Sequence, residues 1–196
     1  ELEKLNIESQ FINGLRITDK QTMGVVEKAL VDFNSEIIEK LKKKECKAAG
    51  LNVSLNNIFI VEQENVRLGF VGRPKKILNE KIQAIVDQQQ IPIISPMGKD
   101  IQGKKYNINA DTAAASIAKS LRSRRLLLMT DVTGVYDENK KLINEIKPEE
   151  AKNLIDKKIV EGGMIPKLLN SIDAIENGVK GVVIIDGRKL HSILYE

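Results

Sequence analysis

The sequence is poor in the residues that build disulfides, metal sites and catalytic triads. It holds one cysteine, Cys46, and one histidine, His191, among 196 residues. A single cysteine excludes an internal disulfide and a CxxC metal knuckle. A single histidine leaves little room for a His-based metal site or a Ser-His-Asp triad. We therefore expect both to be ordinary structural residues, and we expect no metal site built from protein side chains.

Aromatic residues and long apolar runs are scarce as well. There are four Phe, three Tyr and no Trp, and none is interleaved with the basic clusters at 42–44 and 122–125, which argues against a nucleic-acid surface. No apolar run reaches the twenty residues of a spanning helix, and the first five residues lack the layout of a signal peptide. The sequence thus favours a protein of the reducing cytoplasm, with neither a membrane nor a nucleic acid as partner.

Length and charge are those of an ordinary globular domain. The net charge is only +4, because 31 basic residues face 27 acidic ones. A chain of 196 residues can bury a sizeable core without a disulfide or a metal. Since neither a low-complexity linker nor an internal repeat interrupts it, we predict one domain over residues 1–196.

Helical and strand patterns alternate along the chain. Spacings of three and four between apolar residues predict a long helix over 23–41, which Thr18 and Gln21 would open with the spacing of a capping box. Two hairpins are expected, one pairing 57–63 with 66–71 and one within 99–108. Further helices are predicted over 79–90, 112–121, 148–159, 165–177 and 189–195, and buried strands over 91–94, 126–129 and 182–185. This alternation predicts an α/β protein with a mainly parallel sheet covered on both faces.

Ligands bind at the carboxyl ends of such strands, so the turns there are the candidate sites. Arg16 offers a planar fork for a carboxylate beside Gly14, although a surface salt bridge explains an isolated Arg16 better. Asn107 and Asn109 share one face of an extended segment. Asp111 then starts a helix, either as a plain N-cap or as a carboxylate that converges with the two amides.

Two further turns precede or follow apolar elements. Asp131, directly after an apolar strand, can accept hydrogen bonds from a ribose, and Gly134 permits a tight turn; an ordinary Asp turn fits equally well. Gly162 and Gly163 precede a helix whose first N–H groups can face an anion, and Lys167 adds a full charge there. The alternative is that the two glycines only mark the start of the helix and bind nothing.

Five segments, in order and spanning almost the whole chain, resemble the acetylglutamate kinases of the amino-acid kinase superfamily. The Asn-x-Asn-Ala-Asp motif at 107–111 and the Gly-Gly-Met-Ile-Pro-Lys motif at 162–167 are specific within that superfamily. The five segments are residues 4–19 (with Asn13-Gly14-Leu15-Arg16), 106–115, 128–135, 161–167 and 184–188.

The resemblance implies a fold and an activity. The fold would be a three-layer α/β/α sandwich with a mainly parallel central sheet. The activity would be ATP-dependent phosphorylation of the γ-carboxylate of N-acetyl-L-glutamate to N-acetyl-L-glutamyl 5-phosphate, in arginine biosynthesis, with Mg²⁺ accompanying ATP. A homo-oligomer is also implied. No general base is required, because the attacking carboxylate is already ionised at neutral pH.

The resemblance also implies roles for individual residues. Arg16 would grip a carboxylate of the substrate, Asn107 would bind the same molecule, and Asn109 would lie close by. Asp111 would orient the catalytic lysines, and Lys167 would neutralise charge on the transferring phosphoryl group. The residues that would surround the nucleotide are Asp131, Val132, Thr133, Gly134, Val135, Tyr136, Ile159, Val160, Glu161 and Met164.

The chain also departs from the family pattern. Family members carry two glycine-rich turns that cradle the phosphates and the substrate, whereas no glycine precedes Gly14 here. The family's glycine-containing tail is also absent after Glu196. We therefore expect a chain truncated at its N-terminus and incomplete for catalysis as given. Two alternatives remain: a sister kinase of a related acidic amino acid, and a non-catalytic regulatory subunit that binds nucleotide or amino acid.

Overall fold

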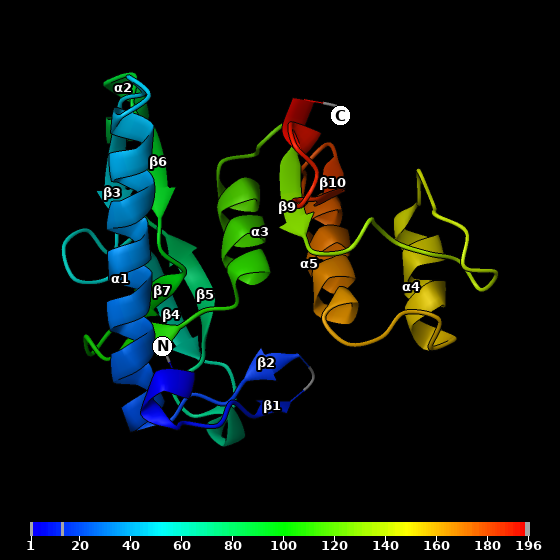
Figure 1. The fold of residues 1–196 in the computed structure, drawn as a ribbon, viewed down its shortest axis with the longest axis horizontal. Coiled ribbons are helices and arrows are strands. Elements are labelled where there is room, and N and C mark those ends of the chain that lie inside the picture. Colours follow the sequence, from blue (N-terminus) through cyan, green and yellow to red (C-terminus); the bar gives the residue numbers. More distant parts are fainter. Residues whose placement is uncertain (1, 13, 195–196) are drawn as a thin grey trace. The chain divides into compact units, whose positions relative to one another are not determined.

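Helices and strands alternate in the computed structural model, which describes residues 2–12 and 14–194 (Figure 1). The chain divides after Ala113 into two compact units, residues 1–113 and 114–196. Each unit has strands and helices of its own. The single domain expected over residues 1–196 stays a prediction.

The first unit combines a parallel strand pair with a four-stranded sheet. Strands β3 and β6 pair in parallel, and helix α1 packs against both. The four-stranded sheet has the order β5-β4-β7-β8, in which two antiparallel hairpins are joined by a parallel contact between β4 and β7. The elements of this unit are η1 (Glu3–Leu5), β1 (Phe11–Ile12), β2 (Leu15–Arg16), α1 (Lys20–Lys42), β3 (Ala48–Leu51), β4 (Phe59–Gln63), η2 (Val66–Leu68), β5 (Gly72–Ile77), α2 (Asn79–Asp87), β6 (Ile91–Ile94), β7 (Met97–Lys99) and β8 (Lys105–Asn107).

Helix α1 begins one residue later than the predicted capping box placed it. Asp19 is the N-cap, and its carboxylate accepts a hydrogen bond from the Thr22 N–H at 2.7 Å. The predicted box of Thr18 and Gln21 is therefore wrong. Thr18 is fully buried and extended, because its backbone pairs with Leu68 and Phe70 and its hydroxyl donates to the Arg16 carbonyl at 3.2 Å.

A buried amide joins α1 to the parallel pair. The side chain of Asn34 is buried and donates from Nδ2 to the carbonyl of Ile93 in β6 at 2.8 Å. Gly50 of β3 lies against the same amide, and a Cβ there would stand 2.6 Å from Asn34 Oδ1. The strand can therefore approach the helix this closely only without a side chain at residue 50. The nearby core contains Met23, Val53 and Met97, with Leu30 and Phe70 packed on it.

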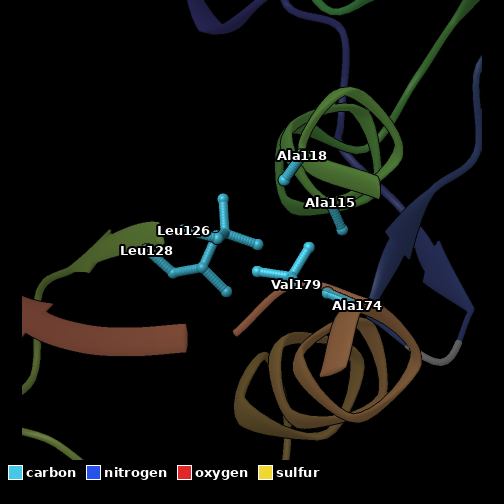
Figure 2. Packing of buried hydrophobic residues seen from close by; sticks show 6 residues of the cluster. All are labelled: Ala115, Ala118, Leu126, Leu128, Ala174 and Val179. Carbon is cyan, nitrogen blue, oxygen red and sulfur yellow. The ribbon is translucent and has the colours of Figure 1, made fainter. Parts of the chain in front are cut away.

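The second unit is built on one parallel pair. Strands β9 and β10 run in register, from Leu126 opposite Val182 to Thr130 opposite Asp186. One core cluster brings small side chains of α3 and α5 together with leucines of β9, as Figure 2 shows for Ala115, Ala118, Ala174, Leu126 and Leu128. The elements are α3 (Ala110–Ser120, which begins before the boundary), β9 (Leu126–Thr130), α4 (Pro148–Asp156), α5 (Met164–Glu176), β10 (Val182–Asp186) and η3 (Ser192–Leu194).

The α/β class and the parallel pairing of the apolar strands are confirmed. Two elements differ from the sequence-based prediction. In the first hairpin the second strand is β5 rather than 66–71, because Asn65 accepts from the Arg67 N–H at 2.9 Å and starts a 3₁₀ turn. In place of the helix predicted over 189–195, only η3 forms, and His191 before it has a positive φ of 58° that a helix does not allow. Tyr195, the last residue of that prediction, lies outside the described residues.

Two positions in the apolar strands are more exposed than the apolar pattern predicts. Leu126 and Leu128 are buried against α3 and α5, whereas Met129 is 54% exposed and Ile91 of β6 is 47% exposed. Leu127 and Ile93, which share a strand face with Met129 and Ile91 respectively, are half-buried. The exposure is therefore local to these two positions.

Candidate functional site

A cavity of about 700 Å³ in the first unit brings three of the predicted substrate residues together. Its lining comes from the β1–β2 hairpin, from α1 and from the junction of β8 with α3, and it includes Arg16, Asn107 and Asn109. Small-molecule sites in proteins range from roughly 300 to 1,000 Å³. The hydrogen-bonding residues thus surround a space of the size that a small substrate needs.

The hairpin holds Arg16 at the cavity wall. Arg16 pairs with Phe11 across the hairpin, and its guanidinium carbon lies 4.7 Å from the centroid of the Phe11 ring. Its Nη1 also donates to the Ser9 hydroxyl. Gly14 has a φ of 79° in the turn, a conformation that favours glycine. Asn13, the first residue of this motif, lies outside the described residues.

Asn109 has a structural task as well as a place in the cavity. Its Oδ1 accepts from the Thr112 N–H at 3.1 Å and from the Thr112 hydroxyl at 3.3 Å, so it caps α3. Asp111 is therefore not the N-cap, and the alternative that gave it this role alone is wrong. It lies half-buried in the first turn of α3 and outside the cavity lining.

The cavity has a polar part and an apolar wall. Arg16 supplies a cation, and the amides of Asn107 and Asn109 can both donate and accept hydrogen bonds. The opposite character comes from α1, which contributes Val25, Val26, Ala29 and Leu30. Glu3 adds one carboxylate to the lining. Such a cavity suits a small molecule that carries a carboxylate, an amide and an aliphatic group.

In the second unit, the segment after β9 has a buried middle and exposed ends. Gly134 and Val135 are buried, while Asp131, Val132 and Tyr136 are exposed. A Cβ on Gly134 would lie 2.9 Å from Leu142 Cδ1, so this position favours glycine. The following turn is closed by Asp137, whose Oδ1 accepts from the N–H groups of Asn139 and Lys141 at 2.9 and 2.8 Å.

The two predicted groups of nucleotide residues meet in one hydrophobic cluster. Val135 and Val160 are buried in it, and Met164 packs against them. Val135 and Val160 are each only 6% exposed, so both belong to the core of this cluster. Ile159 is half-buried, and Glu161 is exposed.

Lys167 lies in the first turn of α5. Gly163 is the N-cap, and Gly162 before it has a φ of 56°. The N–H groups of Met164 and Ile165 donate to carbonyls of the preceding turn at 3.2 and 3.3 Å. The side chain of Lys167 is buried, with 7% of the residue exposed. The N-terminus of a helix carries partial positive charge, so the lysine and the positive end of the helix dipole occur together here.

A second cavity, of about 960 Å³, lies within the second unit. Thr133, Gly134 and Val135 line it, together with apolar residues of α5 and β10. Asp131, Tyr136 and Lys167 lie outside this lining. The segment after β9 therefore contacts the cavity through its buried middle, while its exposed ends face elsewhere.

The sequence motifs predict no role for the charged pair of Asp186 and Arg188, although residues 184–188 form one of the five segments that resemble the acetylglutamate kinases. Asp186 ends β10 and is buried, and Arg188 binds it through Nε and Nη2 at 2.8 Å each. The hydrogen bond from the Arg188 side chain lowers the pKa of Asp186 to about 2, with smaller contributions from the Arg188 N–H and from the charges of Arg188 and Lys189. An Asp-Gly-Arg sequence at the end of a predicted strand was the available signal.

Neither a metal centre nor a membrane span is visible in the described part of the chain. Residues 2–12 and 14–194 contain no group of three His, Cys, Asp or Glu side chains able to hold a metal ion. Within the same residues, none of the helices combines the length and the hydropathy that crossing a membrane requires. A Mg²⁺ ion that is held mostly by nucleotide phosphates and water needs no such group of side chains.

Comparison with known proteins gives consistent matches. The model of the amino acid kinase family matches residues 1–186. The acetylglutamate kinase of Pelagibacter ubique is 52% identical over 195 residues, which are 100% of this chain and 68% of that protein. The acetylglutamate kinase of Caldicellulosiruptor saccharolyticus is 43% identical over 205 residues, covering 100% of this chain and 70% of that protein.

Solved structures agree on the fold. A crystal structure of a Streptococcus mutans protein matches with a TM-score of 0.90 at 30% identity. The match covers 97% of this chain and 78% of the Streptococcus mutans chain. The N-acetylglutamate synthase of Neisseria gonorrhoeae, complexed with coenzyme A and N-acetyl-glutamate, has a TM-score of 0.87 at 21% identity and covers 98% and 45%. The second likeness shows the fold alone.

Proposed function

This chain belongs to the amino acid kinase family, and we propose that the full-length protein catalyses the phosphorylation of N-acetyl-L-glutamate by ATP. A γ-carboxylate oxygen of the substrate forms a bond to the γ-phosphorus of ATP, and the bond from that phosphorus to the β–γ bridging oxygen breaks. The products are N-acetyl-L-glutamyl 5-phosphate and ADP, and the reaction belongs to arginine biosynthesis.

The observation that carries this proposal is the cavity of about 700 Å³ that Arg16, Asn107 and Asn109 line. N-acetyl-L-glutamate offers one group for each of its features. A carboxylate fits the Arg16 fork, the N-acetyl amide fits the two asparagine amides, and the acetyl methyl fits the apolar wall of α1. Free glutamate lacks the acetyl methyl that fits the apolar wall, and its charged ammonium would be desolvated at the position of the amide.

The chemistry places little covalent work on the protein. The attacking carboxylate is ionised at neutral pH, so the reaction requires no general base. Positioning and charge neutralisation dominate phosphoryl transfer. Lys167 and the positive end of the α5 dipole supply positive charge for the transferring group, and Asp111 orients the catalytic lysines. The nucleotide lies against Asp131–Tyr136, Ile159–Glu161 and Met164, and Mg²⁺ comes with its phosphates.

The test is a trapping assay on the full-length protein. Hydroxylamine converts an acyl phosphate to a hydroxamate, which can be measured by its colour with iron. We expect hydroxamate with N-acetyl-L-glutamate and little with L-glutamate. Equal rates on the two, or a faster rate on a longer or carrier-linked acidic amino acid, would favour a sister kinase. ATP binding without hydroxamate from any acidic substrate would favour a regulatory subunit.

A further inference from the structure

The charged pair at the end of β10 has one buried and one exposed member. Asp186 accepts from the Arg188 N–H at 3.0 Å as well as from Nε and Nη2 at 2.8 Å, so three hydrogen bonds fix it. The side chain of Asp186 is 5% exposed, whereas that of Arg188 is 61% exposed. A buried carboxylate therefore holds the orientation of an arginine that faces solvent.

The pair lies against the end of β9, where the proposed nucleotide segment begins. Thr130 is opposite Asp186 in the sheet, and the Gly187 N–H donates to the Thr130 carbonyl at 2.8 Å. A Cβ on Gly187 would meet Met129 Cε at 3.3 Å and the Thr130 carbonyl oxygen at 3.4 Å. The turn carrying Arg188 thus packs on the last residues of β9, next to Asp131.

Electrostatics connect Arg188 to the start of that segment. The hydrogen bond to Asp186 raises the pKa of the guanidinium most, and the negative charges of Asp186 and Asp131 raise it further. Arg188 therefore stands in the field of Asp131, the first residue of the segment 131–136. The carboxyl ends of parallel strands are also where α/β proteins bind their ligands.

Arg188 has donors left for a ligand. A guanidinium carries five N–H groups, and Asp186 takes one from Nε and one from Nη2. Within residues 2–12 and 14–194, Asp186 is the side chain to which this guanidinium is hydrogen-bonded, so three N–H groups remain for solvent or a ligand. Because Asp186 already orders the side chain, a ligand that binds it loses less conformational entropy.

We propose that Arg188 binds a phosphate group of the nucleotide and that Asp186 is its positioning residue. The planar fork of arginine matches two oxygens of a phosphate. Asp131 and Arg188 would then bind different parts of the nucleotide at this edge of the sheet. Asp131 would accept hydrogen bonds from the ribose hydroxyls, and Arg188 would donate to a phosphate. This inference rests on the proposed assignment of residues 131–136 to ATP.

The first experiment measures binding of ATP, ADP and adenosine to the full-length protein by titration calorimetry. Arg188→Gln is compared with Lys189→Gln, which removes the same charge from the next exposed residue but leaves the fork to Asp186 in place. A charge-assisted hydrogen bond predicts a tenfold to hundredfold loss of ATP and ADP affinity, roughly, in Arg188→Gln. We expect adenosine affinity to be unchanged in both variants and ATP affinity to change less than about threefold in Lys189→Gln.

Three outcomes of this comparison would overturn the proposal. An unchanged ATP affinity in Arg188→Gln would show that Arg188 makes no energetically significant contact with a phosphate. An equal loss of adenosine affinity would point to the base or the ribose as the partner. An equal loss in Lys189→Gln would show general attraction by charge in place of a defined contact.

The second experiment tests Asp186 as a positioning residue by a double-mutant cycle. Asp186→Asn keeps the shape but replaces one acceptor oxygen with an NH₂ group, which breaks the fork. We expect a loss of ATP affinity with adenosine affinity kept, and no further loss when Asp186→Asn is added to Arg188→Gln. Losses that multiply in the double variant would mean that Asp186 acts independently of Arg188 and would contradict the positioning role.

This test can fail separately from the proposed function. A protein that forms hydroxamate from N-acetyl-L-glutamate while Arg188→Gln binds ATP normally would overturn the inference alone. A protein that binds ATP through Arg188 but yields no acyl phosphate would overturn the proposed function alone. A parent protein that binds neither ATP nor ADP would overturn both.

Discussion

Lys167 and Arg16 are both cations, and we propose different roles for them because their surroundings differ. Lys167 is buried at the start of α5, where positive charge is fixed before any ligand arrives. Arg16 lies half-buried at the wall of a cavity, with its guanidinium over the Phe11 ring. Charge that grows during phosphoryl transfer is stabilised by the first kind of site, and a carboxylate already present in the substrate is bound by the second.

The two residues should therefore change different kinetic constants in the full-length protein. Lys167→Ala should lower kcat by about 10²–10³ with little change in KM, since a preorganised donor to the transition state is lost. Arg16→Ala should raise KM for N-acetyl-L-glutamate by roughly tenfold to a hundredfold, the loss of one charge-assisted hydrogen bond. Lys76→Ala, at an exposed position of β5, is the control and should change neither. Steady-state kinetics showing the reverse pattern would refute both assignments.

Asp186 makes a prediction about acid stability. Its pKa falls from 3.8 to about 2 in the folded protein, chiefly through the hydrogen bond from Arg188. Because the folded pKa is lowered, this carboxylate stabilises the fold above pH 3.8, and the contribution disappears as the pH falls toward 2. Urea unfolding between pH 2 and pH 5 should thus show a steeper loss of stability for the parent than for Asp186→Asn. Parallel pH profiles would contradict the linkage.

For single residues, the sequence motifs predict the proposed substrate residues better than they predict the contacts of those residues. Arg16, Asn107 and Asn109 were named from motifs, and the cavity brings them together. The cap on α3 was not foreseen, because Asn109 and Asp111 are both good capping residues and only the backbone geometry decides between them. The Asp186–Arg188 pair was also missed, since burial of one partner and exposure of the other are properties of the folded chain.

Among the elements, α1 packs closely against strands β3 and β6. The buried amide of Asn34 bonds to β6, and Gly50 of β3 leaves room for it. The periodic apolar residues predict α1 well. They do not predict that a polar residue is buried on it, because hydropathy patterns assign an asparagine to the solvent side.

Glycine-to-alanine substitutions should separate close packing from helix propensity in this region. Gly50→Ala should destabilise the protein by about 1–3 kcal/mol, because its Cβ would stand 2.6 Å from Asn34 Oδ1. Gly24→Ala, in α1 with nothing within 4 Å of the added Cβ, should stabilise it by about 0.5–1 kcal/mol. Chemical denaturation of both variants checks the signs, and a neutral Gly50→Ala would show that Asn34 can move aside.

Other elements differ from their sequence patterns for local reasons. Val66–Leu68 has the composition of a strand, yet Asn65 caps it as a 3₁₀ turn. Residues 189–195 have a helical pattern, but His191 adopts a positive φ that only the folded chain reveals. Period and composition predict the long elements, and short polar contacts decide the brief ones.

On the scale of the whole molecule, α3 is the element that belongs to both units. Its first turn, with the Asn109 cap, lies before the boundary at Ala113, and Ala115 and Ala118 lie in the core of the second unit. Helix formation is cooperative over neighbouring turns. Loss of the core around one end of α3 should therefore weaken the other end as well.

We accordingly expect a single unfolding transition, as the predicted single domain requires. Differential scanning calorimetry of the full-length protein should give one peak whose calorimetric and van't Hoff enthalpies agree. As a control, Ala115→Gly in α3 should lower the melting temperature of that one peak without splitting it. Two resolved peaks would show instead that residues 1–113 and 114–196 melt as separate domains.

Binding of the proposed substrate at Asn109 should reduce fraying of the backbone at the start of α3. Its Oδ1 holds the Thr112 N–H, its carbonyl holds the Ala113 N–H at 2.9 Å, and its side chain also borders the cavity. A molecule that binds the Asn109 amide keeps the side chain in its capping position and so suppresses fraying of the helix end. Deuterium uptake at Thr112 and Ala113 should therefore slow when N-acetyl-L-glutamate is bound, and α3 would carry that protection past the boundary between the two units.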